Sequence, residues 1–466
     1  MPGRRRRGVL LAHEARTLLK LAGPIILSQL GQVGMNMLDT IMVGPLGANS
    51  LAAVGLAGAL HNAVLLICTG TLLGMGPLVS QAFGAGERLE CRRTLVNGLW
   101  LGVLLCVPVI WVNWIGEPLA LALGQDPEVA AIVGGYLRAL AWGVPPVVLF
   151  FAIRQFLEGM GLTRPAMLLT FLGLVLNYFG NRAFIYGVGD TIPAMGAVGS
   201  GWATTLVRWG MLLGMVAYLL WNPKLHPFRG IRRFPDAERL RAIAKIGTPA
   251  GVVLGLEVGV FSFAAVMMGW IGPIALAAHQ VTLNIAATTF MVALGVSLAG
   301  AVRVGHHIGA GNAAGVRRAV AVTYALALGF MGVCALIFLT APRMLLGIYT
   351  SDPAILGLGS SLLFFAAVFQ LFDGAQVAGV CTLRGAADTR VPMVLAALGY
   401  WGVGVPAALW LGFRTPLGPV GVWSGLCLAL GAAALLLALR VRKVLWTGTA
   451  RLRPAVAHET QAPAVA

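Results

Sequence analysis

The sequence has 466 residues, of which 58% are hydrophobic and only 11% are charged, and its mean hydropathy is +0.86. A soluble domain normally carries about 25% charged residues, so this composition excludes an ordinary soluble protein and indicates a polytopic membrane protein. The formal net charge of +17 would suggest a nucleic-acid partner for a soluble chain. Because the basic residues lie in short connectors between apolar segments, we expect membrane topology to explain the charge and expect no nucleic-acid partner.

The first segment begins with four arginines, Arg4 to Arg7, followed by a short apolar run that resembles a signal peptide. His13, Glu14, Arg16 and Lys20 interrupt that run. We therefore expect no cleaved signal and read the segment as the start of the first membrane helix.

Long apolar segments, each bounded by charged or Gly/Pro-rich turns, predict about twelve membrane-spanning helices, because one span needs about 20 mainly apolar residues. The expected segments are 17–43, 48–77, 95–115, 130–153, 165–187, 193–220, 245–270, 274–302, 318–340, 357–381, 391–412 and 418–440. The fold class that follows is an all-α integral membrane protein.

The basic residues divide unevenly between the two sides of these spans. Of 33 lysines and arginines, 28 fall in the termini and in the connectors that share their side. Only Arg182, Arg343 and Arg414 fall on the other side, and Arg138 and Arg208 fall within spans. Since positive connectors stay in the cytoplasm, we predict that both termini are cytoplasmic and that the protein lies in the inner membrane.

Several short motifs recur at one spacing of 225 residues without a gap. The matched pairs are Lys20 to Pro24 with Lys245 to Pro249, Gly84 to Gly86 with Gly309 to Gly311, and Arg92-Arg93 with Arg317-Arg318. Such a repeat predicts two pseudo-symmetric bundles of six helices each, related by an axis along the membrane normal.

The repeat also predicts a division of the chain into five parts. We expect a basic cytoplasmic N-terminus at 1–16, a first lobe at 17–221, a cytoplasmic linker at 222–244, a second lobe at 245–441 and a disordered cytoplasmic tail at 442–466.

Three carboxylates fall inside predicted spans: Asp39, Glu257 and Asp373. A charged side chain in the bilayer costs several kcal/mol, so such residues are usually functional. Burial of a carboxylate favours binding of a proton or a metal cation. The alternatives are a helix cap for Asp39, a neutral hydrogen-bonded group for Glu257 and an interhelical hydrogen bond for Asp373.

Other polar residues in the spans are weaker candidates. Asn177 and Asn181 lie four residues apart on one helix face, where their amide oxygens could complete a cation site or join two helices. His279 and Gln280 could act in a binding site, although a lone histidine is more often structural. Met35, with other methionines and with phenylalanines such as Phe261, could line an apolar cavity or pack in the core.

The sequence contains none of the common nucleophile or metal motifs that would indicate an enzyme. The six cysteines are scattered without metal-ligand spacing. We therefore expect no catalytic residues, no bound cofactor and no catalytic metal.

The ordered motifs resemble the multidrug and toxic compound extrusion (MATE) family, in its NorM-like branch. The resemblance extends from about Leu18 to Arg440. It is carried by Met37 to Gly44, Val79 to Gln81, Gly247 to Pro249, Leu256-Glu257, Leu276 to Gln280, Val302 to Gly305, Gly309 to Asn312 and Gln370 to Gln376.

This resemblance implies a V-shaped pair of six-helix lobes that exchanges lipophilic, often cationic compounds for Na⁺ or H⁺. It implies a cation site at Glu257 and Asp373 and a polar site at Asp39, Asn177 and Asn181, either of which could hold Na⁺. One position departs from the NorM-like pattern, which has tyrosine one turn before the second acid where this chain has Phe369. The ring can still contact a cation, but a hydroxyl ligand is lost. The resemblance favours Na⁺ slightly over H⁺.

We therefore predict a cation-coupled antiporter that exports lipophilic compounds as a monomer in the bilayer. The candidate substrate-cavity residues are His279, Gln280, Phe261, Phe369, Gln376 and Met35. One alternative is a lipid-precursor flippase of the same superfamily, which would need a basic cavity for a pyrophosphate head group. Another is a membrane-embedded enzyme, which would need clustered catalytic residues.

Overall fold

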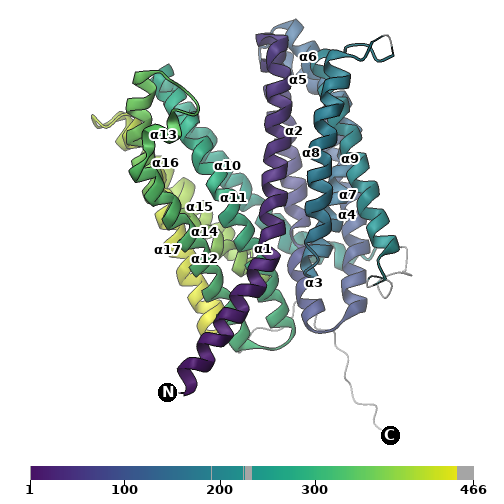
Figure 1. Cartoon of the computed structure of the whole chain (residues 1–466), viewed down its shortest axis with the longest axis vertical. Helices are drawn as coiled ribbons and strands as arrows, with labels where there is room; N and C mark the ends of the chain where they lie inside the picture. The colour runs from purple at the N-terminus through teal and green to yellow at the C-terminus, as the bar shows by residue number, and fades with distance from the viewer. Residues whose placement is uncertain (1, 190, 224, 226–233, 449–466) are drawn as a thin grey trace.

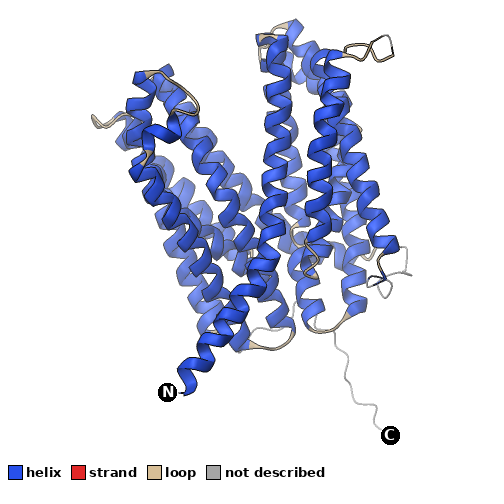
Figure 2. Cartoon of the chain, in the orientation of Figure 1, coloured by secondary structure: helices blue, strands red, loops and turns tan. Residues whose placement is uncertain are grey.

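We describe a computed structural model of the chain that covers residues 2–189, 191–223, 225 and 234–448. These residues are almost entirely helical, and no strand element occurs among them (Figure 2). The helices gather into two bundles that touch at one end and separate toward the other, which gives the molecule the shape of a V (Figure 1).

The first bundle contains the helices up to residue 221. They are α1 (Pro2–Val43), the 3₁₀ turn η1 (Gly44–Leu46), α2 (Ala48–Leu72), α3 (Met75–Gly84), α4 (Arg88–Trp114), α5 (Gly116–Ala122), α6 (Pro127–Ala141), α7 (Val144–Gly159), α8 (Arg164–Tyr186) and α9 (Gly196–Trp221).

The second bundle contains the remaining helices. They are α10 (Ala237–Ile271), α11 (Pro273–Gly309), α12 (Ala313–Thr340), α13 (Pro342–Leu346), α14 (Pro353–Gly385), α15 (Arg390–Ala397), the π-helix η3 (Leu398–Gly404), α16 (Val405–Phe413), α17 (Pro419–Val441) and the π-helix η4 (Arg442–Thr447).

The described residues contain ten helical segments long and apolar enough to cross a membrane, and an eleventh if the bent pair α6 and α7 counts as one span. Helix α1 covers the remaining predicted span, 17–43, but is not among the ten. Its midsection carries Gln29, Gln32, Asn36 and Asp39, which lower its hydropathy. The chain is thus a multi-pass membrane protein.

The two bundles repeat one plan, as the sequence spacing predicts. Helices α2 and α11 begin at residues 48 and 273, and α4 and α12 begin at 88 and 313. Gly86 and Gly311, at the same spacing, both adopt positive φ angles of 79° and 64° in the turns before α4 and α12. Glycine adopts this left-handed conformation without a steric cost. The fold class predicted from the sequence, two pseudo-symmetric six-helix bundles, is confirmed.

Several helix ends differ from the predicted ends. Helix α10 begins at Ala237, inside the predicted linker 222–244, because the Asp236 side chain caps it by accepting a hydrogen bond from the Glu238 N–H at 3.0 Å. The predicted basic N-terminus continues α1 as helix. Met1, residues 224 and 226–233 of the linker and residues 449–466 of the tail lie outside the described residues.

At the end where the bundles touch, which we call the joined end, their backbones approach closely. Gly70, at the end of α2, faces Gly251 of α10, and Gly247 of α10 faces the carbonyl of Thr71. A methyl group at Gly70 or Gly247 would overlap the facing backbone, and one at Gly251 would lie in tight contact with Gly70. Small residues spaced four apart allow this packing between membrane helices.

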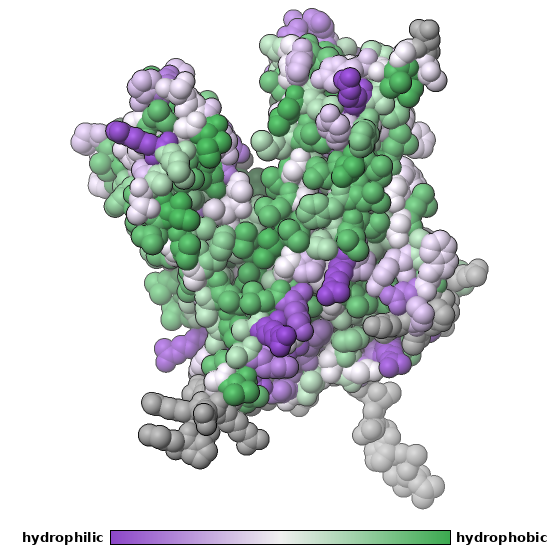
Figure 3. Space-filling view, in the orientation of Figure 1, coloured by the Kyte–Doolittle hydropathy of each residue, from purple (hydrophilic) through white to green (hydrophobic). Residues whose placement is uncertain are grey.

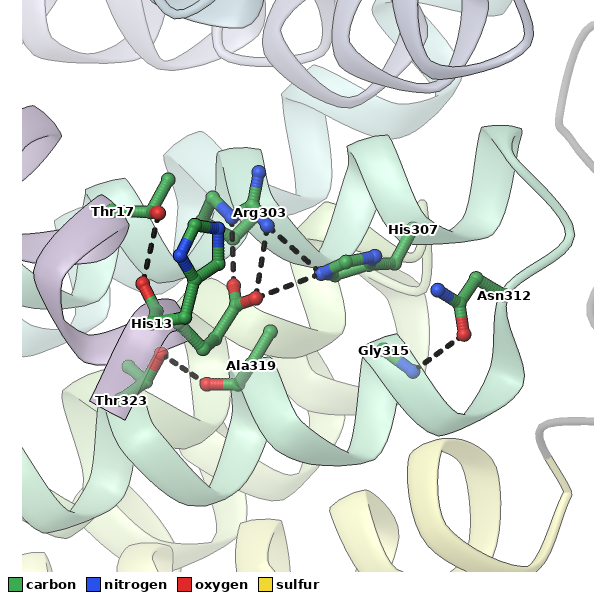
Figure 4. A network of polar contacts seen from close by, with 9 residues as sticks. His13, Thr17, Arg303, His307, Asn312, Gly315, Ala319 and Thr323 are labelled. Atoms are coloured by element: carbon green, nitrogen blue, oxygen red, sulfur yellow. Dashed lines mark hydrogen bonds and ion pairs between the residues drawn. The ribbon is translucent and has the colours of Figure 1, made fainter. Parts of the chain in front are cut away.

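Helix α1 also crosses the joined end. Its main part packs in the first bundle against α8, and its N-terminal part packs on α11 of the second bundle (Figure 1). There Arg303 and His307 of α11 contact the carboxylate of Glu14 on α1, as the dashed lines in Figure 4 mark. We call this cluster the latch.

Candidate functional site

The second bundle contains a cavity of about 490 Å³ between α10, α11 and α14. Most of its lining is apolar, and two carboxylates interrupt it. The lining residues are Glu257, Val258, Phe261, Ser262, Ala265, Gln280, Leu283, Ala286, Ala287, Phe290, Phe369 and Asp373. A cavity of this size, with few polar groups, suits a drug-sized apolar molecule.

Glu257 of α10 and Asp373 of α14 both line this cavity, although 116 residues separate them in the sequence. Glu257 Oε2 accepts a hydrogen bond from Gln376 Nε2 at 3.3 Å. Asp373 is 4% exposed, and its Oδ1 has no hydrogen-bond partner among the described residues. A buried carboxylate oxygen without a partner is costly, and binding of a proton or a small cation would relieve that cost.

Aromatic rings form one wall beside the two acids. Phe261 and Phe369 lie with their ring centroids 6.4 Å apart, and Phe369 lies 5.6 Å from Trp423 behind it. Phe369 and Asp373 are one helical turn apart on α14. Ring faces beside carboxylates can bind a lipophilic cation by combining apolar contact with cation–π attraction.

Tyr400 is a candidate site residue that the sequence analysis missed. It is fully buried in the π-helical segment η3, near Gln376 and close enough to Glu257 and Asp373 to interact with them electrostatically. Its hydroxyl has no hydrogen-bond partner among the described residues. Tyr400 therefore brings a hydroxyl to the region where Phe369 lacks one. The only sequence signal was a tyrosine inside an apolar span, which alone has many explanations.

His279 and Gln280 occupy different environments although they are neighbours on α11. Gln280 is exposed and lines the cavity. His279 is fully buried, its ring packs edge-on against Trp423 at 5.7 Å, and neither ring nitrogen has a partner within the described residues. It lies behind the aromatic wall and does not line the cavity.

In the first bundle, the structure brings Asp39, Asn177 and Asn181 together, as the sequence analysis predicted. Asp39 Oδ1 accepts a hydrogen bond from Asn181 Nδ2 at 2.6 Å, and Asp39 Oδ2 accepts a hydrogen bond from the Thr204 hydroxyl at 3.1 Å. Asn181 Nδ2 also donates to Asn177 Oδ1 at 3.2 Å. Both oxygens of Asp39 thus already accept hydrogen bonds, unlike Asp373 Oδ1 in the second bundle.

Asp39 and Asn177 line a smaller cavity of about 110 Å³ together with Met35 and Arg208. Arg208 Nη1 lies 3.4 Å from His61 Nε2. The first-bundle cavity therefore contains a fixed positive charge, whereas no Lys or Arg lines the larger cavity. Arg138, the other arginine predicted within a span, pairs with Glu117 and lines neither cavity.

No group of three or more His, Cys, Asp or Glu side chains in the described part of the chain is arranged to hold a metal ion. A cation in the larger cavity would therefore bind to the two carboxylates and to neutral oxygens. Such a donor set suits a hard cation, because hard cations prefer oxygen ligands.

Comparison with known proteins identifies the family. The MatE family model matches residues 24–182 and again residues 249–410, one copy in each bundle. The probable multidrug resistance protein NorM of Mesorhizobium japonicum is 37% identical over 454 residues, which cover 96% of each chain. The multidrug resistance protein PmpM of Pseudomonas aeruginosa is 36% identical over 449 residues, covering 94% of this chain and 93% of that protein.

Solved structures agree on the fold. A crystal structure of MATE in the bent conformation aligns with a TM-score of 0.85 at 23% identity, covering 94% of this chain and 97% of that one. The eukaryotic MATE transporter AtDTX14 aligns with a TM-score of 0.85 at 20% identity, covering 95% and 98%. The chain belongs to the MatE family of multidrug efflux transporters and is a membrane transporter rather than an enzyme.

Proposed function

We propose that this protein is an antiporter that exports lipophilic, often cationic compounds in exchange for Na⁺ or H⁺. The observation that carries the proposal is that Glu257 and Asp373 line the same cavity of about 490 Å³ as the aromatic wall. The named multidrug resistance relatives support the substrate class.

One shared cavity makes the cation and the compound competitors. A cation at Glu257 and Asp373 neutralises the charge that attracts a cationic compound, and a bound compound occupies the space and the charge that the cation needs. Each ligand then lowers the affinity for the other by the same factor, since linkage between two binding equilibria is reciprocal. A cation entering from outside would favour release of the compound.

The first-bundle network is proposed as a second polar site that responds to the cation. Asp39 already accepts hydrogen bonds from Asn181 and Thr204, and Arg208 lines the same small cavity. Binding of a proton or of Na⁺ there would have to replace these bonds. Protonation would weaken the bonds to Asp39 and allow the helices that carry them to rearrange.

Export requires that the cavity open alternately to the two sides. We propose that the joined end is cytoplasmic, because the connectors with most of the positive charge lie at that end. The V then opens toward the outside, and the latch and the close glycine contacts hold the cytoplasmic side shut. The protein would work in the inner membrane, with both termini in the cytoplasm, as a monomer.

A cysteine introduced at Asn222 tests the sidedness. In a variant without the six native cysteines, a membrane-impermeant thiol reagent should leave Asn222→Cys unlabelled in intact cells and label it after lysis. Labelling in intact cells would place the joined end outside and contradict the proposed topology.

The function is tested in proteoliposomes. If Na⁺ is the coupling ion, an imposed Na⁺ gradient at equal pH should drive efflux of a lipophilic cation. If H⁺ is the coupling ion, an imposed pH gradient in Na⁺-free buffer should drive it. Glu257→Gln keeps the size of the side chain, so we expect normal membrane insertion and loss of coupled efflux. Glu238→Gln, an exposed acid on the same helix, should export normally. Normal export by inserted Glu257→Gln would contradict the proposal.

The flippase alternative is not favoured. A lipid pyrophosphate would need basic residues in the larger cavity, and its lining has two carboxylates and no Lys or Arg.

A further inference from the structure

A groove of about 670 Å³ lies on the first bundle, where α1, the turn before α8, α8 itself and α9 meet. None of its lining residues lines either of the two candidate cavities. Its lining combines Lys20 and Arg164 with Thr163, Leu168 and Tyr218, so it offers positive charge, hydroxyl groups and an apolar wall in one place.

The two basic side chains of the groove have no acidic partner. Lys20 and Arg164 are both exposed, and no hydrogen bond or ion pair joins either side chain to another described residue. Glu158, the acid nearest to Arg164 in sequence, is bonded to Arg154 at 2.6 Å. Glu14, the acid nearest to Lys20, belongs to the latch. The groove therefore keeps two uncompensated positive charges.

The start of α8 adds to this positive region. The first turn of a helix has N–H groups without intrahelical acceptors and carries the positive end of the helix dipole. Thr163 precedes α8, is only 4% exposed and makes no capping hydrogen bond, although its side chain lines the groove. Pro165, the second residue of α8, has no N–H, so the attraction for an oxyanion comes from the Thr163 hydroxyl and the positive end of the helix dipole together with the two basic side chains.

An apolar surface continues from the groove along α8. Leu168, which lines the groove, is 63% exposed, and further exposed side chains follow it at helical spacing. They are Phe171, Leu172, Val175, Leu176 and Phe179. On the face seen in Figure 3, hydrophilic residues gather near the joined end and apolar surface lies above them. A ligand with a charged head and a long apolar tail would match this order.

We propose that the groove binds one anionic phospholipid, with its phosphate near Lys20, Arg164 and the first turn of α8 and an acyl chain along the exposed leucines of α8. Basic pockets between membrane helices on the cytoplasmic side commonly take such head groups. The assignment to the cytoplasmic leaflet rests on the sidedness proposed above, but the binding itself does not.

The charge of the groove sets the expected selectivity. Each lysine or arginine near an anionic lipid surface contributes a factor of roughly five in affinity, so two residues give about tenfold to thirtyfold over a zwitterionic lipid. The apolar wall should contribute equally to both lipids and should not discriminate between them.

The test counts bound lipids by native mass spectrometry on purified, delipidated protein titrated with phosphatidylglycerol or phosphatidylcholine. The wild type should bind one phosphatidylglycerol at least tenfold more tightly than phosphatidylcholine. Lys20→Gln with Arg164→Gln should lose that preference. Arg241→Gln with Arg317→Gln, which removes two exposed charges that do not line the groove, should keep it within twofold. Circular dichroism checks that each variant is folded.

Three results would overturn the proposal. The first is equal affinity of the wild type for the two lipids. The second is an equal loss of the phosphatidylglycerol preference in both double variants. The third is binding of glycerol 1-phosphate as tightly as phosphatidylglycerol, which would indicate a site for a soluble phosphate. If the groove variant does not fold, Lys20→Gln and Arg164→Gln are measured singly, each should lower the preference by a factor of roughly five, and an undiminished preference in both would contradict the proposal. None of these results depends on transport activity.

Discussion

Glu14 on α1 and Arg303 on α11 form a bidentate ion pair across the joined end, 289 residues apart in sequence, with Nε–Oε1 and Nη2–Oε2 distances of 2.7 and 2.9 Å. His307 Nε2 lies 3.2 Å from the same carboxylate and 3.0 Å from Arg303 Nη2. One nitrogen cannot donate to Glu14 and accept from Arg303 at once, so the His307 tautomer decides which contact is a hydrogen bond (Figure 4).

Glu14→Gln should open the joined end. Hydrogen bonds to charged groups contribute about 1.5–3 kcal/mol, so losing the ion pair should shift the equilibrium between closed and open joined ends by roughly tenfold to a hundredfold. With one spin label on each bundle at the joined end, the measured distances between the labels should include a larger population of long distances. Glu87→Gln, an exposed acid before α4, should leave the distances unchanged. If Glu14→Gln and the wild type gave the same distance distribution, the latch would not contribute to closure.

The Glu14 carboxylate of the latch should stay ionised over the physiological pH range. Burial alone would raise the pKa of Glu14, but hydrogen bonds from His307 and Arg303, and their charges, lower the pKa to about 2. A carboxylate with a lowered pKa contributes stability above the unfolded-state value of 4.5, and this contribution is lost as pH falls from there toward 2.

In a His307→Gln background, which removes the histidine that contacts this carboxylate, the Glu14→Gln effect on the spin-label distances should therefore be the same at pH 6 and pH 8. An effect that disappears between these two values would show that Glu14 titrates near neutrality and would contradict the pKa argument.

Gly247→Ala should prevent full closure of the joined end. The added methyl group would overlap the carbonyl of Thr71 in the first bundle, and neither backbone can move without shifting a helix. Gly255→Ala is a matched control, because Gly255 lies on the same helix and has open space where the methyl group would be. We expect lower thermal stability and a wider joined end for Gly247→Ala only. Equal behaviour of both variants would mean that the close packing there is not needed.

Tyr400→Phe should weaken cation binding and leave binding of the compound intact. The hydroxyl is buried without a partner near Glu257 and Asp373 in the described structure, so it can act as a ligand or donor when the cation binds. Loss of one such interaction is worth about 1 kcal/mol, or roughly fivefold in the cation concentration that halves drug binding. Tyr324→Phe removes another buried hydroxyl that lacks a partner among the described residues and should have no effect. An unchanged midpoint in Tyr400→Phe would exclude the hydroxyl from the site.

The sequence predicts the repeat and the class of fold because both depend on local features. Twenty or more apolar residues make a span wherever they occur, and matched Gly, Pro and Arg positions at one spacing identify the two halves. Helix interruptions are harder to predict. The break between α6 and α7 is marked by Gly143, Pro145 and Pro146, but prolines also occur inside the unbroken helices α1 and α10, so the mark does not decide the outcome. The π-helix that carries Tyr400 depends on helix packing and could not be predicted from composition.

The candidate site was partly predictable. Glu257, Asp373 and Asp39 stood out because ionisable residues are rare within spans, and the structure brings the first two to one cavity. Their roles stay predictions. The Glu14–Arg303 pair was not foreseen, because both residues lie near span ends, where charge is common and indicates sidedness. Only the path of α1 across to the second bundle brings them together.

A cation and a lipophilic compound should compete at Glu257 and Asp373, and the proposed antiport depends on this competition. It is tested most directly by equilibrium binding of labelled tetraphenylphosphonium to the purified protein, with Na⁺ raised at constant pH and ionic strength, or with pH lowered in Na⁺-free buffer. One of the two cations should weaken binding at least tenfold in the wild type and less than twofold in the Glu257→Gln, Asp373→Asn double variant. The claim would be contradicted if neither cation changed the affinity of the wild type for tetraphenylphosphonium. It would also be contradicted if the double variant kept the full effect of the cation.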